Sequence, residues 1–584
     1  MCARGGGSSP RASMRRRENQ CVTESCREVD AVVVGAGFAG LYAHHRLRQL
    51  GLTLRGYEAA ADVGGTWWWN RYPGARCDVE SMDYCYSFSP ELEQEWTWSE
   101  RYATQPEILR YVNHVADRFD LRRDVRFETR VSAAAWDEAA QRWHIVTDRG
   151  ERVSAQFCIM AVGCLSAAKR PEVEGVDTFR GPTFHTGQWP HEGADFTGMH
   201  VGVIGTGSSG IQSIPLIAQQ ATHLTVFQRT PNFTMPAKNA PLDPASVRAR
   251  KARYREHRQA MRESRAGVLV PAPEESALRV DAEERQARYE SAWESGTLYG
   301  MVAAFNDLLV DRDANETAAE FARARIGDIV DDPEVAERLS PRNHPFGTKR
   351  PCLDTGYYAT YNRDNVTLVD VRSTPIVEIT PTGIRTTSDE HPLDAIVFAT
   401  GFDAMTGPLL GPDITGVGGR SLREKWAAGP RTFLGIATAG FPNLFTVTGP
   451  GSPSVLVNMA VAIEQHVEWI ADCIAYMRER GLASIDATVE AEDTWVDHVN
   501  QVASHTLFPT ANSWYMGANV PGKPRVFMPY IGGFPRYTET CDTVAADGYR
   551  GFTLKERGAD PHAPKFDNSS AANFGPRERR RSSW

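Results

Sequence analysis

Glycines at fixed spacing and a later acidic residue form the first group of residues that could do chemistry in this chain. Gly35, Gly37 and Gly40 make the pattern G-x-G-x-x-G, and Glu58 follows 23 residues after Gly35. In a dinucleotide site, the first glycine allows a tight turn, the second lets the backbone approach a pyrophosphate, and the third permits close helix packing. The carboxylate accepts a hydrogen bond from a ribose 2′-hydroxyl, so this group predicts a site for FAD or NAD.

The glycine pattern occurs a second time, 170 residues later, and a different charge follows it. Where the first group has its acid, the second strand ends in Gln228, Arg229 and Thr230, and no carboxylate is present. A carboxylate would repel a 2′-phosphate, whereas arginine binds phosphate through charge-assisted hydrogen bonds, so the second group suits NADP. Two copies of one site would not differ in this way, and the pair favours a flavoprotein that NADPH reduces. The pattern residues assigned to NADP are Gly205, Thr206, Gly207, Ser208 and Gly210.

Both glycine groups need a strand before them and a helix after them. Ala31–Val34 is a continuous apolar run that predicts a buried strand, Leu41–Leu50 has helical character, and Leu52–Tyr57 predicts a second strand. Val201–Ile204 and Leu224–Phe227 predict the equivalent strands of the second group. These elements predict an α/β fold with two Rossmann-like dinucleotide-binding domains.

A loop rich in glycine and aromatic residues, Asp62–Ser81, follows the first group. Such a loop suits a large planar ligand, and successive tryptophans are seldom mere core because their N–H groups need partners. Asp78 ends a turn-rich run and can project into the same site, with an ordinary surface aspartate as the alternative. Tyr84 follows in a segment that we expect to be strand-like. The residues assigned here to the first cofactor are Gly65, Thr66, Trp67, Asp78 and Tyr84.

Composition limits the class of protein. A chain of 584 residues is too long for one core, which predicts two or three domains. The net charge of −9 argues against nucleic acid as a partner, and no run of 18 apolar residues indicates a membrane span. The ten cysteines form no C-x-x-C pair, which fits reduced thiols in the cytoplasm. We predict a cytoplasmic enzyme, and we expect a monomer without a metal site.

One further motif lies between the two glycine groups. Phe179–Pro190 reads F-x-G-x-x-x-H-x-x-x-W-P, and Ala399-Thr400-Gly401 follows an apolar strand later in the chain. With these motifs, the chain resembles the type I Baeyer–Villiger monooxygenases, which are class B flavoproteins, over residues 29 to 553. It is most similar to the phenylacetone and steroid monooxygenase branch.

This resemblance implies an activity. The cofactors would be FAD and NADPH, and the substrates a small-molecule ketone and O2. One oxygen atom would be inserted next to the ketone carbonyl through a C4a-peroxyflavin, giving an ester or a lactone. The motif residue His185 would be a structural hinge residue that links domains.

The resemblance also assigns residues in the second half of the chain. Lys349 matches a contact to the NADP 2′-phosphate, and Arg350 matches the active-site arginine, although spacing alone would leave them as a surface pair. Arg350 would stabilise the peroxide anion and the later oxyanion, because a guanidinium keeps its proton at working pH, and Asp78 would orient it. Trp514 would lie over the cofactor and substrate. The candidate ketone contacts are Ser454, Val455, Leu456, Met459 and Cys164, and a long helix is expected from Val455 onward.

The motifs and changes of composition divide the chain into predicted parts. An arginine-, glutamate- and alanine-rich stretch predicts a helical insertion in the NADP domain. The predicted parts are a disordered leader (1–28), the FAD-binding domain (29–165 and 394–553), the NADP-binding domain (166–235 and 342–393), the helical insertion (236–341) and a disordered tail (554–584).

Other functions remain open at this stage. A flavin N- or S-monooxygenase would keep both cofactors, but a heteroatom nucleophile attacks a protonated hydroperoxide and would not need Arg350. An NADPH-dependent reductase of a protein partner is less favoured, because no C-x-x-C pair and no obvious docking patch is present. A non-enzymatic nucleotide sensor is the least favoured interpretation.

Overall fold

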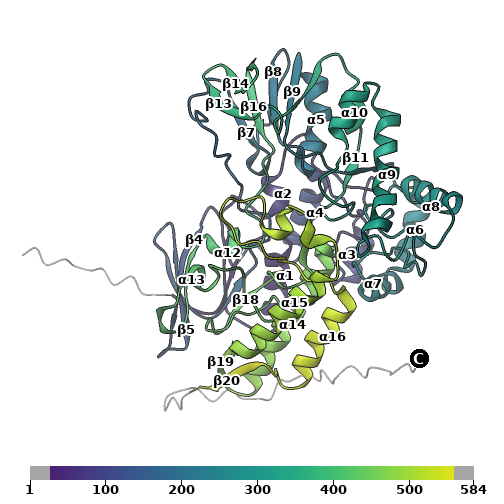
Figure 1. The fold of residues 1–584 in the computed structure, drawn as a ribbon. Helices are drawn as coiled ribbons and strands as arrows, with labels where there is room; N and C mark the ends of the chain where they lie inside the picture. Colours follow the sequence, from purple (N-terminus) through teal and green to yellow (C-terminus); the bar gives the residue numbers. More distant parts are fainter. Residues whose placement is uncertain (1–26, 558–584) are drawn as a thin grey trace, which may run out of the picture.

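The computed structural model describes residues 27–557, which form two α/β lobes with a group of helices beside them (Figure 1). The predicted disordered leader and tail lie almost wholly outside the described residues. Their inner boundaries are wrong, since Arg27 and Glu28 already belong to strand β1 and Leu554 belongs to strand β20. In both places the backbone pairs with a neighbouring strand.

The larger sheet runs in the order β17–β4–β5–β6–β1–β2–β3, and β18 pairs with β6. Its centre is parallel, and β1 is apolar on both faces because the sheet is covered on both sides; Val32 and Val33 are fully buried. Strands β4, β5 and β6 pair antiparallel. The strands are β1 (Arg27–Val34), β2 (Leu54–Tyr57), β3 (Val125–Arg126), β4 (Val131–Asp137), β5 (Arg142–Thr147), β6 (Arg152–Met160), β17 (Asp413–Thr415) and β18 (Leu444–Thr446).

Helices α1 (Phe38–Gln49) and α14 (Met459–Glu479) pack together beside this sheet. Helix α1 begins directly after Gly37, as the glycine pattern predicts, and α14 brings a distant part of the chain back to it (Figure 1). The same lobe contains α2 (Thr66–Trp69), α3 (Pro90–Glu95), α4 (Gln105–Arg118), α12 (Gly407–Leu410), α13 (Leu422–Lys425), α15 (Val489–Ser504), α16 (Phe534–Ala546) and the antiparallel pair β19 (Leu482–Ala487) and β20 (Phe552–Glu556).

The smaller lobe is built on a parallel sheet in the order β12–β9–β8–β16–β7. Helix α5 (Ser208–Gln220) follows β8 and begins directly after Gly207, so that it includes Gly210. The fold class predicted from the two glycine groups is therefore confirmed. The elements are β7 (Thr183–His185), β8 (His200–Ile204), β9 (His223–Gln228), β12 (Val366–Asp370) and β16 (Ala395–Phe398), with a small antiparallel sheet of β13 (Ile376–Thr380), β14 (Gly383–Thr386) and β15 (Glu390–Pro392).

Residues 236–341 leave the smaller lobe as helices and return beside it (Figure 1). Strands β10 (Thr234–Pro236) and β11 (Cys352–Asp354) pair in parallel and close the base of this excursion. Within residues 27–557, no helix is both long and apolar enough to cross a membrane. The remaining helices are α6 (Pro244–Ala252), α7 (Tyr254–Glu263), α8 (Ala282–Ser295), α9 (Arg312–Ile329), α10 (Pro333–Leu339) and α11 (Tyr357–Thr360).

Three local predictions are wrong. The segment of Tyr84 is a turn rather than a strand, because the Tyr84 amide donates back to Glu80. Thr66–Trp69 forms the short helix α2 instead of an irregular loop. The long helix starts at Met459 and not at Val455, because the side chain of Asn458 accepts a hydrogen bond from the Ala460 amide and caps the helix there.

Candidate functional site

Arg350 and Asp78, which are 272 residues apart in sequence, meet in a two-pronged ion pair. Arg350 Nε donates to Asp78 Oδ2 at 2.6 Å and Nη2 donates to Asp78 Oδ1 at 2.9 Å. Arg350 Nη1 donates to the Val455 carbonyl at 2.8 Å. A guanidinium has five N–H groups, so these three hydrogen bonds leave two, and the hydroxyl groups of Tyr299 and Tyr515 lie beside the guanidinium as further acceptors.

The charge of this arginine is secured by its surroundings. Burial opposes a charged guanidinium, but Asp78 raises the pKa of Arg350 well above its usual value. The Arg350 side chain is 20% exposed and that of Asp78 is 25% exposed, so the pair is not sealed in the core. The site therefore holds a fixed positive charge with N–H donors beyond those that Asp78 and Val455 bind, and this charge can stabilise an oxygen that gains negative charge.

The segment before Asp78 is placed by the smaller lobe. The Tyr72 hydroxyl donates to Gln212 Oε1 at 2.7 Å, and Gln212 Nε2 donates to the Arg76 carbonyl at 3.1 Å. Gln212 lies on α5, and a Cβ on Gly74 would overlap its carbonyl oxygen. Asp78 therefore sits where the two lobes meet, on a chain segment that touches both.

Arg350 is placed by the strands at the base of the insertion. The amide of Cys352, on β11, donates to the Phe233 carbonyl at 3.1 Å. Asn232 Nδ2 donates to the Arg350 carbonyl at 3.2 Å. The third partner of Arg350, the Val455 carbonyl, is presented by the turn η3 (Ser454–Leu456), in which Ser454 has a φ of +42° and donates to the Thr448 carbonyl at 3.1 Å.

The first glycine group forms a tight turn against the loop that follows β2. Gly35 has a φ of +104°, and a Cβ on Gly40 would overlap the Gly35 carbonyl oxygen. Gly37 faces Gly65, where a Cβ would lie 2.8 Å from Gly37 Cα. The two glycine loops thus leave no room for side chains between them. Since no side chain caps α1 at Gly37, the amides at its start are open to a pyrophosphate, and these residues fit a bound dinucleotide.

Glu58 lies at the same turn, and the backbone binds it. Its Oε2 accepts the Ala36 amide at 2.7 Å and its Oε1 accepts the Ala60 amide at 2.8 Å. Burial raises the pKa of this carboxyl, while the hydrogen bonds from Ala60 and Ala36 lower it. A carboxylate has about four acceptor sites, so Glu58 can hold the turn and still accept a ribose hydroxyl.

The aromatic residues predicted for the first cofactor lie between the glycine turn and Asp78. Trp67 is buried, and its Nε1 donates to the Tyr84 hydroxyl at 3.3 Å. Burial raises the pKa of Tyr84, and Asp78 and Cys164 act on it in the same direction. Thr66 is exposed at the start of α2. Trp67 and Tyr84 therefore form one hydrogen-bonded aromatic pair.

The second glycine group repeats the turn with more open space. Gly205 has a φ of +107°, and a Cβ on Gly210 would overlap the Gly205 carbonyl oxygen. A Cβ on Gly207 would meet nothing within 4 Å. Thr206 Oγ1 donates to the Thr230 carbonyl at 3.0 Å, and Ser208 Oγ lies 3.2 Å from Cys352 Sγ. No side chain caps α5 at Gly207, so its start can also receive a phosphate.

Three cations gather near this second group. Burial and the neighbouring charge of Arg229 lower the pKa of Lys349 to about 8. Arg229 also lowers the pKa of Lys169, after the larger effect of burial. Among residues 27–557, neither Arg229 nor Lys349 forms an ion pair with a carboxylate. Mutually repelling cations without a counter-ion favour an anionic ligand, and the donor set fits a 2′-phosphate.

The predicted ketone contacts gather in one apolar cluster. Cys164 and Val455 are buried members of it, and Leu456, Met459 and Trp514 pack against them. Ser454 lies at its edge, where its hydroxyl is 3.8 Å from Met405 Sδ. The cluster includes Val455, whose carbonyl accepts the hydrogen bond from Arg350. Its other buried members are Ala404, Met405, Ala503, Phe508, Tyr515, Met516, Phe527 and Met528.

His185 lies where the two lobes connect. Its Nδ1 accepts the Gly187 amide at 3.0 Å, and its Nε2 lies 3.1 Å from the Lys169 carbonyl and 3.3 Å from Thr400 Oγ1. These contacts join the motif at 179–190 to the Ala399-Thr400-Gly401 turn. They provide a geometric reason for a linking role rather than a chemical one.

Comparisons with known proteins agree on one family. A family model of the pyridine nucleotide-disulphide oxidoreductases matches residues 29–253. A protein named Baeyer-Villiger monooxygenase from Pseudooceanicola batsensis is 46% identical over 536 residues, which cover 91% of this chain and 97% of that relative. The chain belongs to the Baeyer–Villiger monooxygenase family. This confirms the resemblance that the motifs had indicated.

Two more family comparisons bear on chemistry. A solved structure described as oxidized steroid monooxygenase bound to NADP is 57% identical, with a TM-score of 0.87, and the match covers 91% of this chain and 100% of that one. A phenazine N-monooxygenase from Lysobacter antibioticus is 42% identical, covering 90% of this chain and 97% of the relative. The relatives of this chain thus include an enzyme that is named as an N-monooxygenase.

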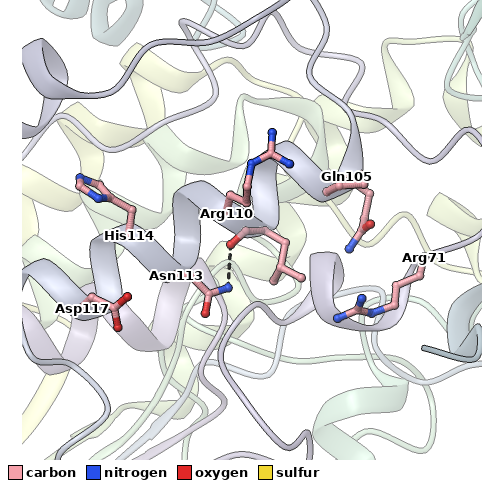
Figure 2. Close-up of a pocket in the computed structure, with 8 residues that line it drawn as sticks. Arg71, Gln105, Arg110, Asn113, His114 and Asp117 are labelled. Carbon is pink, nitrogen blue, oxygen red and sulfur yellow. Dashed lines mark hydrogen bonds between the residues drawn. The ribbon is translucent and has the colours of Figure 1, made fainter. Parts of the chain in front are cut away.

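A shallow cavity of about 500 Å³ lies on the outer face of α4, away from this centre (Figure 2). Arg71, Arg110 and His114 line it, and Figure 2 shows Arg110 and His114 spaced along the helix with Arg71 on a neighbouring segment. Arg71 lies 4.9 Å from the centre of the Trp68 ring. None of the residues assigned to the cofactors or the ketone lines this cavity.

Two tyrosines beside Arg350 were not predicted from the sequence. The hydroxyl groups of Tyr299 and Tyr515 lie next to the guanidinium, which lowers their pKa values while burial raises them more strongly. Tyr515 adjoins the predicted residue Trp514, so the loop motif could have indicated it. Tyr299 belongs to the helical insertion, and no sequence signal placed it in this Baeyer–Villiger site.

Proposed function

We propose that this chain is an FAD-containing, NADPH- and O2-dependent monooxygenase that converts a ketone to an ester or a lactone. The observation that carries the proposal is Arg350, fixed in place by both oxygens of Asp78 and by the Val455 carbonyl, with N–H donors left over. Family membership supports the reaction class. FAD when bound supplies the redox and oxygen-activating chemistry, and the protein supplies position and field.

Arg350 has two tasks in this proposal. Its raised pKa keeps it protonated, so its free N–H groups can donate to the ketone oxygen and stabilise the negative charge that develops there. Asp78 keeps the guanidinium in one plane, so the donors are aimed before the substrate arrives. A lysine would not serve, because it lacks the planar fork that Asp78 grips.

The remaining residues would bind the two cofactors and the ketone and would exclude water. Glu58 and the loops at Gly37 and Gly65 would bind FAD, with Trp67 and Tyr84 beside its ring. Arg229, Lys349 and the amides that follow Gly207 would bind NADPH. The apolar cluster around Val455 and Met459 would receive the carbon skeleton of the ketone and keep water away from Arg350.

We also propose which segments form each domain. Residues 29–165 and 394–553 would form the FAD-binding domain, and residues 166–235 and 342–393 the NADP-binding domain, with 236–341 as an insertion. The ketone is a small molecule of the aryl, cyclic or steroid kind. We further propose a monomer that works in the cytoplasm and binds no nucleic acid.

The test is product analysis under labelled oxygen. FAD-loaded protein is incubated with NADPH, ¹⁸O2 and a panel of aryl, cyclic and steroid ketones, and esters are sought by mass spectrometry. The proposal requires an ester or lactone carrying one ¹⁸O atom from at least one ketone. Phenazine is assayed in parallel because of the N-monooxygenase relative. Labelled N-oxide from phenazine with no ester from any ketone would replace the ketone proposal with nitrogen oxygenation.

A further inference from the structure

Tyr299 is held rigidly against the segment that carries Arg350. It lies between α8 and α9, and this part of the chain packs on the turn at Gly347, where a Cβ would lie 2.6 Å from Val302 Cγ1. Asn315 binds that turn through both backbone groups of Phe346, at 2.8 and 2.9 Å. The loop that carries Tyr299 and the helix α9 that follows it therefore pack, through Val302 and Asn315, on the turn that leads to Arg350.

The hydroxyl of Tyr299 is buried and lacks a hydrogen-bond partner within the described residues. Its oxygen is withdrawn from solvent and makes no well-aligned hydrogen bond within residues 27–557. The Arg350 guanidinium beside it lowers its pKa, but burial raises the pKa more, so the phenol keeps its proton. An unpaired buried hydroxyl is unfavourable, and it persists where a ligand completes it.

The neighbouring charge decides how this hydroxyl is turned. A guanidinium has only donors, so the Tyr299 oxygen faces Arg350 with its lone pairs. The O–H bond then points away from the guanidinium, and it has no acceptor within residues 27–557. In the proposed reaction the acceptor is the ketone oxygen.

We propose that Tyr299 donates a hydrogen bond to the oxygen of the bound ketone, next to Arg350. This inference rests on the proposed function and adds a specificity-determining residue to it. A carbonyl oxygen receives both donors, whereas a thioether of the same shape offers no comparable acceptor. Tyr299 thus favours ketones over sulfides in a pocket whose apolar walls fit both.

The direct test is Tyr299→Phe, which keeps the ring and removes the hydroxyl. Phenylacetone and benzyl methyl sulfide serve as probes of matched shape, with ester and sulfoxide as products. One neutral hydrogen bond predicts a roughly two- to tenfold loss of kcat/KM for phenylacetone. The value for the sulfide and the rate of flavin reduction by NADPH should stay within about twofold of wild type.

A spectroscopic readout separates this role from a merely structural one. Isotope-edited infrared spectra of ¹³C-carbonyl phenylacetone bound to the oxidised, NADP⁺-loaded protein report on hydrogen bonds to its oxygen without turnover. The carbonyl stretch should move to higher frequency in Tyr299→Phe. The matched control is Tyr289→Phe, a buried tyrosine of α8 whose hydroxyl lies 2.7 Å from Thr317, and it should change neither readout.

The outcomes distinguish the two proposals. Equal losses for ketone and sulfide, or an unmoved carbonyl band, overturn the role of Tyr299 and leave the proposed function standing. The same holds if Tyr289→Phe produces the same changes. Absence of ester from wild type with every ketone overturns the proposed function, and the role of Tyr299 falls with it.

Discussion

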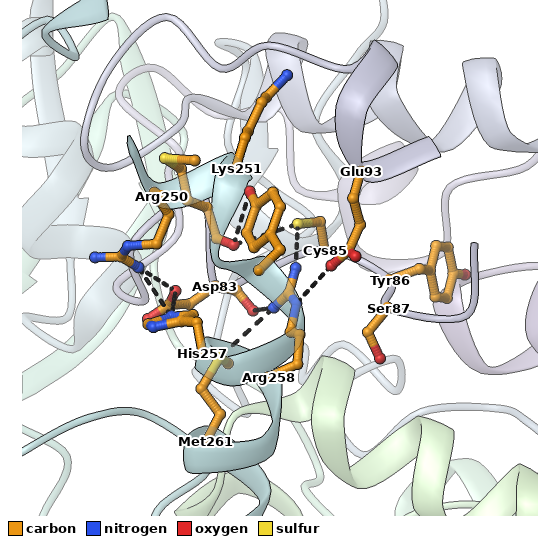
Figure 3. Close-up of polar contacts among 12 residues, drawn as sticks. Asp83, Cys85, Tyr86, Ser87, Glu93, Arg250, Lys251, His257, Arg258 and Met261 are labelled. Carbon is orange, nitrogen blue, oxygen red and sulfur yellow. Dashed lines mark hydrogen bonds and ion pairs between the residues drawn. The ribbon is translucent and has the colours of Figure 1, made fainter. Parts of the chain in front are cut away.

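Two arginines at lobe contacts, Arg258 and Arg350, use the same side chain for different purposes. Arg258 on α7 donates to Glu93 Oε1 at 2.8 Å, to the Asp83 carbonyl at 3.3 Å and to Cys85 Sγ at 3.0 Å (Figure 3). It also lies 3.6 Å from Met261 Sδ and 5.0 Å from the centre of the Tyr254 ring. Its side chain is 9% exposed, against 20% for Arg350.

The difference lies in the donors that remain. Arg258 directs four of its five N–H groups to carboxylate, carbonyl and sulfur acceptors, whereas Asp78 and Val455 take three of those of Arg350 and only the hydroxyl groups of Tyr299 and Tyr515 lie beside the other two. A saturated arginine ties elements together, and an unsaturated one can bind a ligand. Burial and charge alone would not distinguish them.

Arg258 also helps to position the segments that carry the partners of Arg350. The Asp83 carbonyl that receives Arg258 also accepts Asn458 Nδ2 at 2.8 Å, so α7, the segment after Asp78 and the cap of α14 are joined at one oxygen (Figure 3 shows the α7 side). Asp83 lies five residues after Asp78 and Asn458 three after Val455. The Asp83 carbonyl thus links the chain segments that carry Asp78 and Val455, the two partners of Arg350.

The largest expected effect on stability follows from Arg258→Met. Removing the guanidinium leaves Glu93 buried without its partner, which should cost about 3–5 kcal/mol in the free energy of unfolding. Chemical denaturation measures it. Arg253→Met is the control, because its pair with Glu256 is exposed and worth well under 1 kcal/mol. Equal effects of the two variants would remove the distinction between a saturated and a surface arginine.

A smaller effect, on the preference for NADPH over NADH, is expected from Arg229→Ala. This variant tests the cations near the second glycine group. Losing one charge-assisted contact to a 2′-phosphate should reduce the preference for NADPH over NADH by roughly ten- to a hundredfold, from about 1.5–3 kcal/mol. Steady-state kcat/KM for both nucleotides gives the ratio. Arg325→Ala, in an exposed network with Glu290 and Asp328, is the control. An unchanged ratio in Arg229→Ala would move the 2′-phosphate contact to other residues.

The smallest effect concerns pH. With a pKa of about 8, Lys349 is charged at pH 7 and loses its proton as the pH rises through that value. A neutral lysine attracts phosphate less, so KM for NADPH should rise between pH 7 and pH 9 by up to about tenfold, while KM for NADH stays flat. Lys349→Met should abolish this rise. A rise that persists in Lys349→Met would mean that another group titrates.

The sequence predicted the parts of the site that the backbone itself requires. Glycines at 35, 40, 205 and 210 follow from turns in which a side chain has no room, so their spacing alone indicates strand, turn and helix. The pairing of Asp78 with Arg350 spans 272 residues and was reached only through the family resemblance. Their chemical roles stay predictions.

Other features could not be predicted because they depend on tertiary contacts. Tyr299 reaches Arg350 only because the insertion folds back onto the turn at Gly347. The start of α14 depends on the side chain of Asn458, which overrides an apolar helical pattern that begins at Val455. The saturation of Arg258 requires sulfur, carbonyl and carboxylate partners from a segment about 165 residues away.

The central claim is that Arg350 serves oxygen insertion and not flavin reduction. The most direct measurement is the ratio of ester formed to NADPH consumed, in wild type and Arg350→Ala, with the anaerobic rate of flavin bleaching recorded on the same samples. The account predicts a ratio near one for wild type, a fall of about a hundredfold or more in the variant, and a bleaching rate within about tenfold of wild type. Ester formed by Arg350→Ala at a ratio close to that of wild type would contradict it.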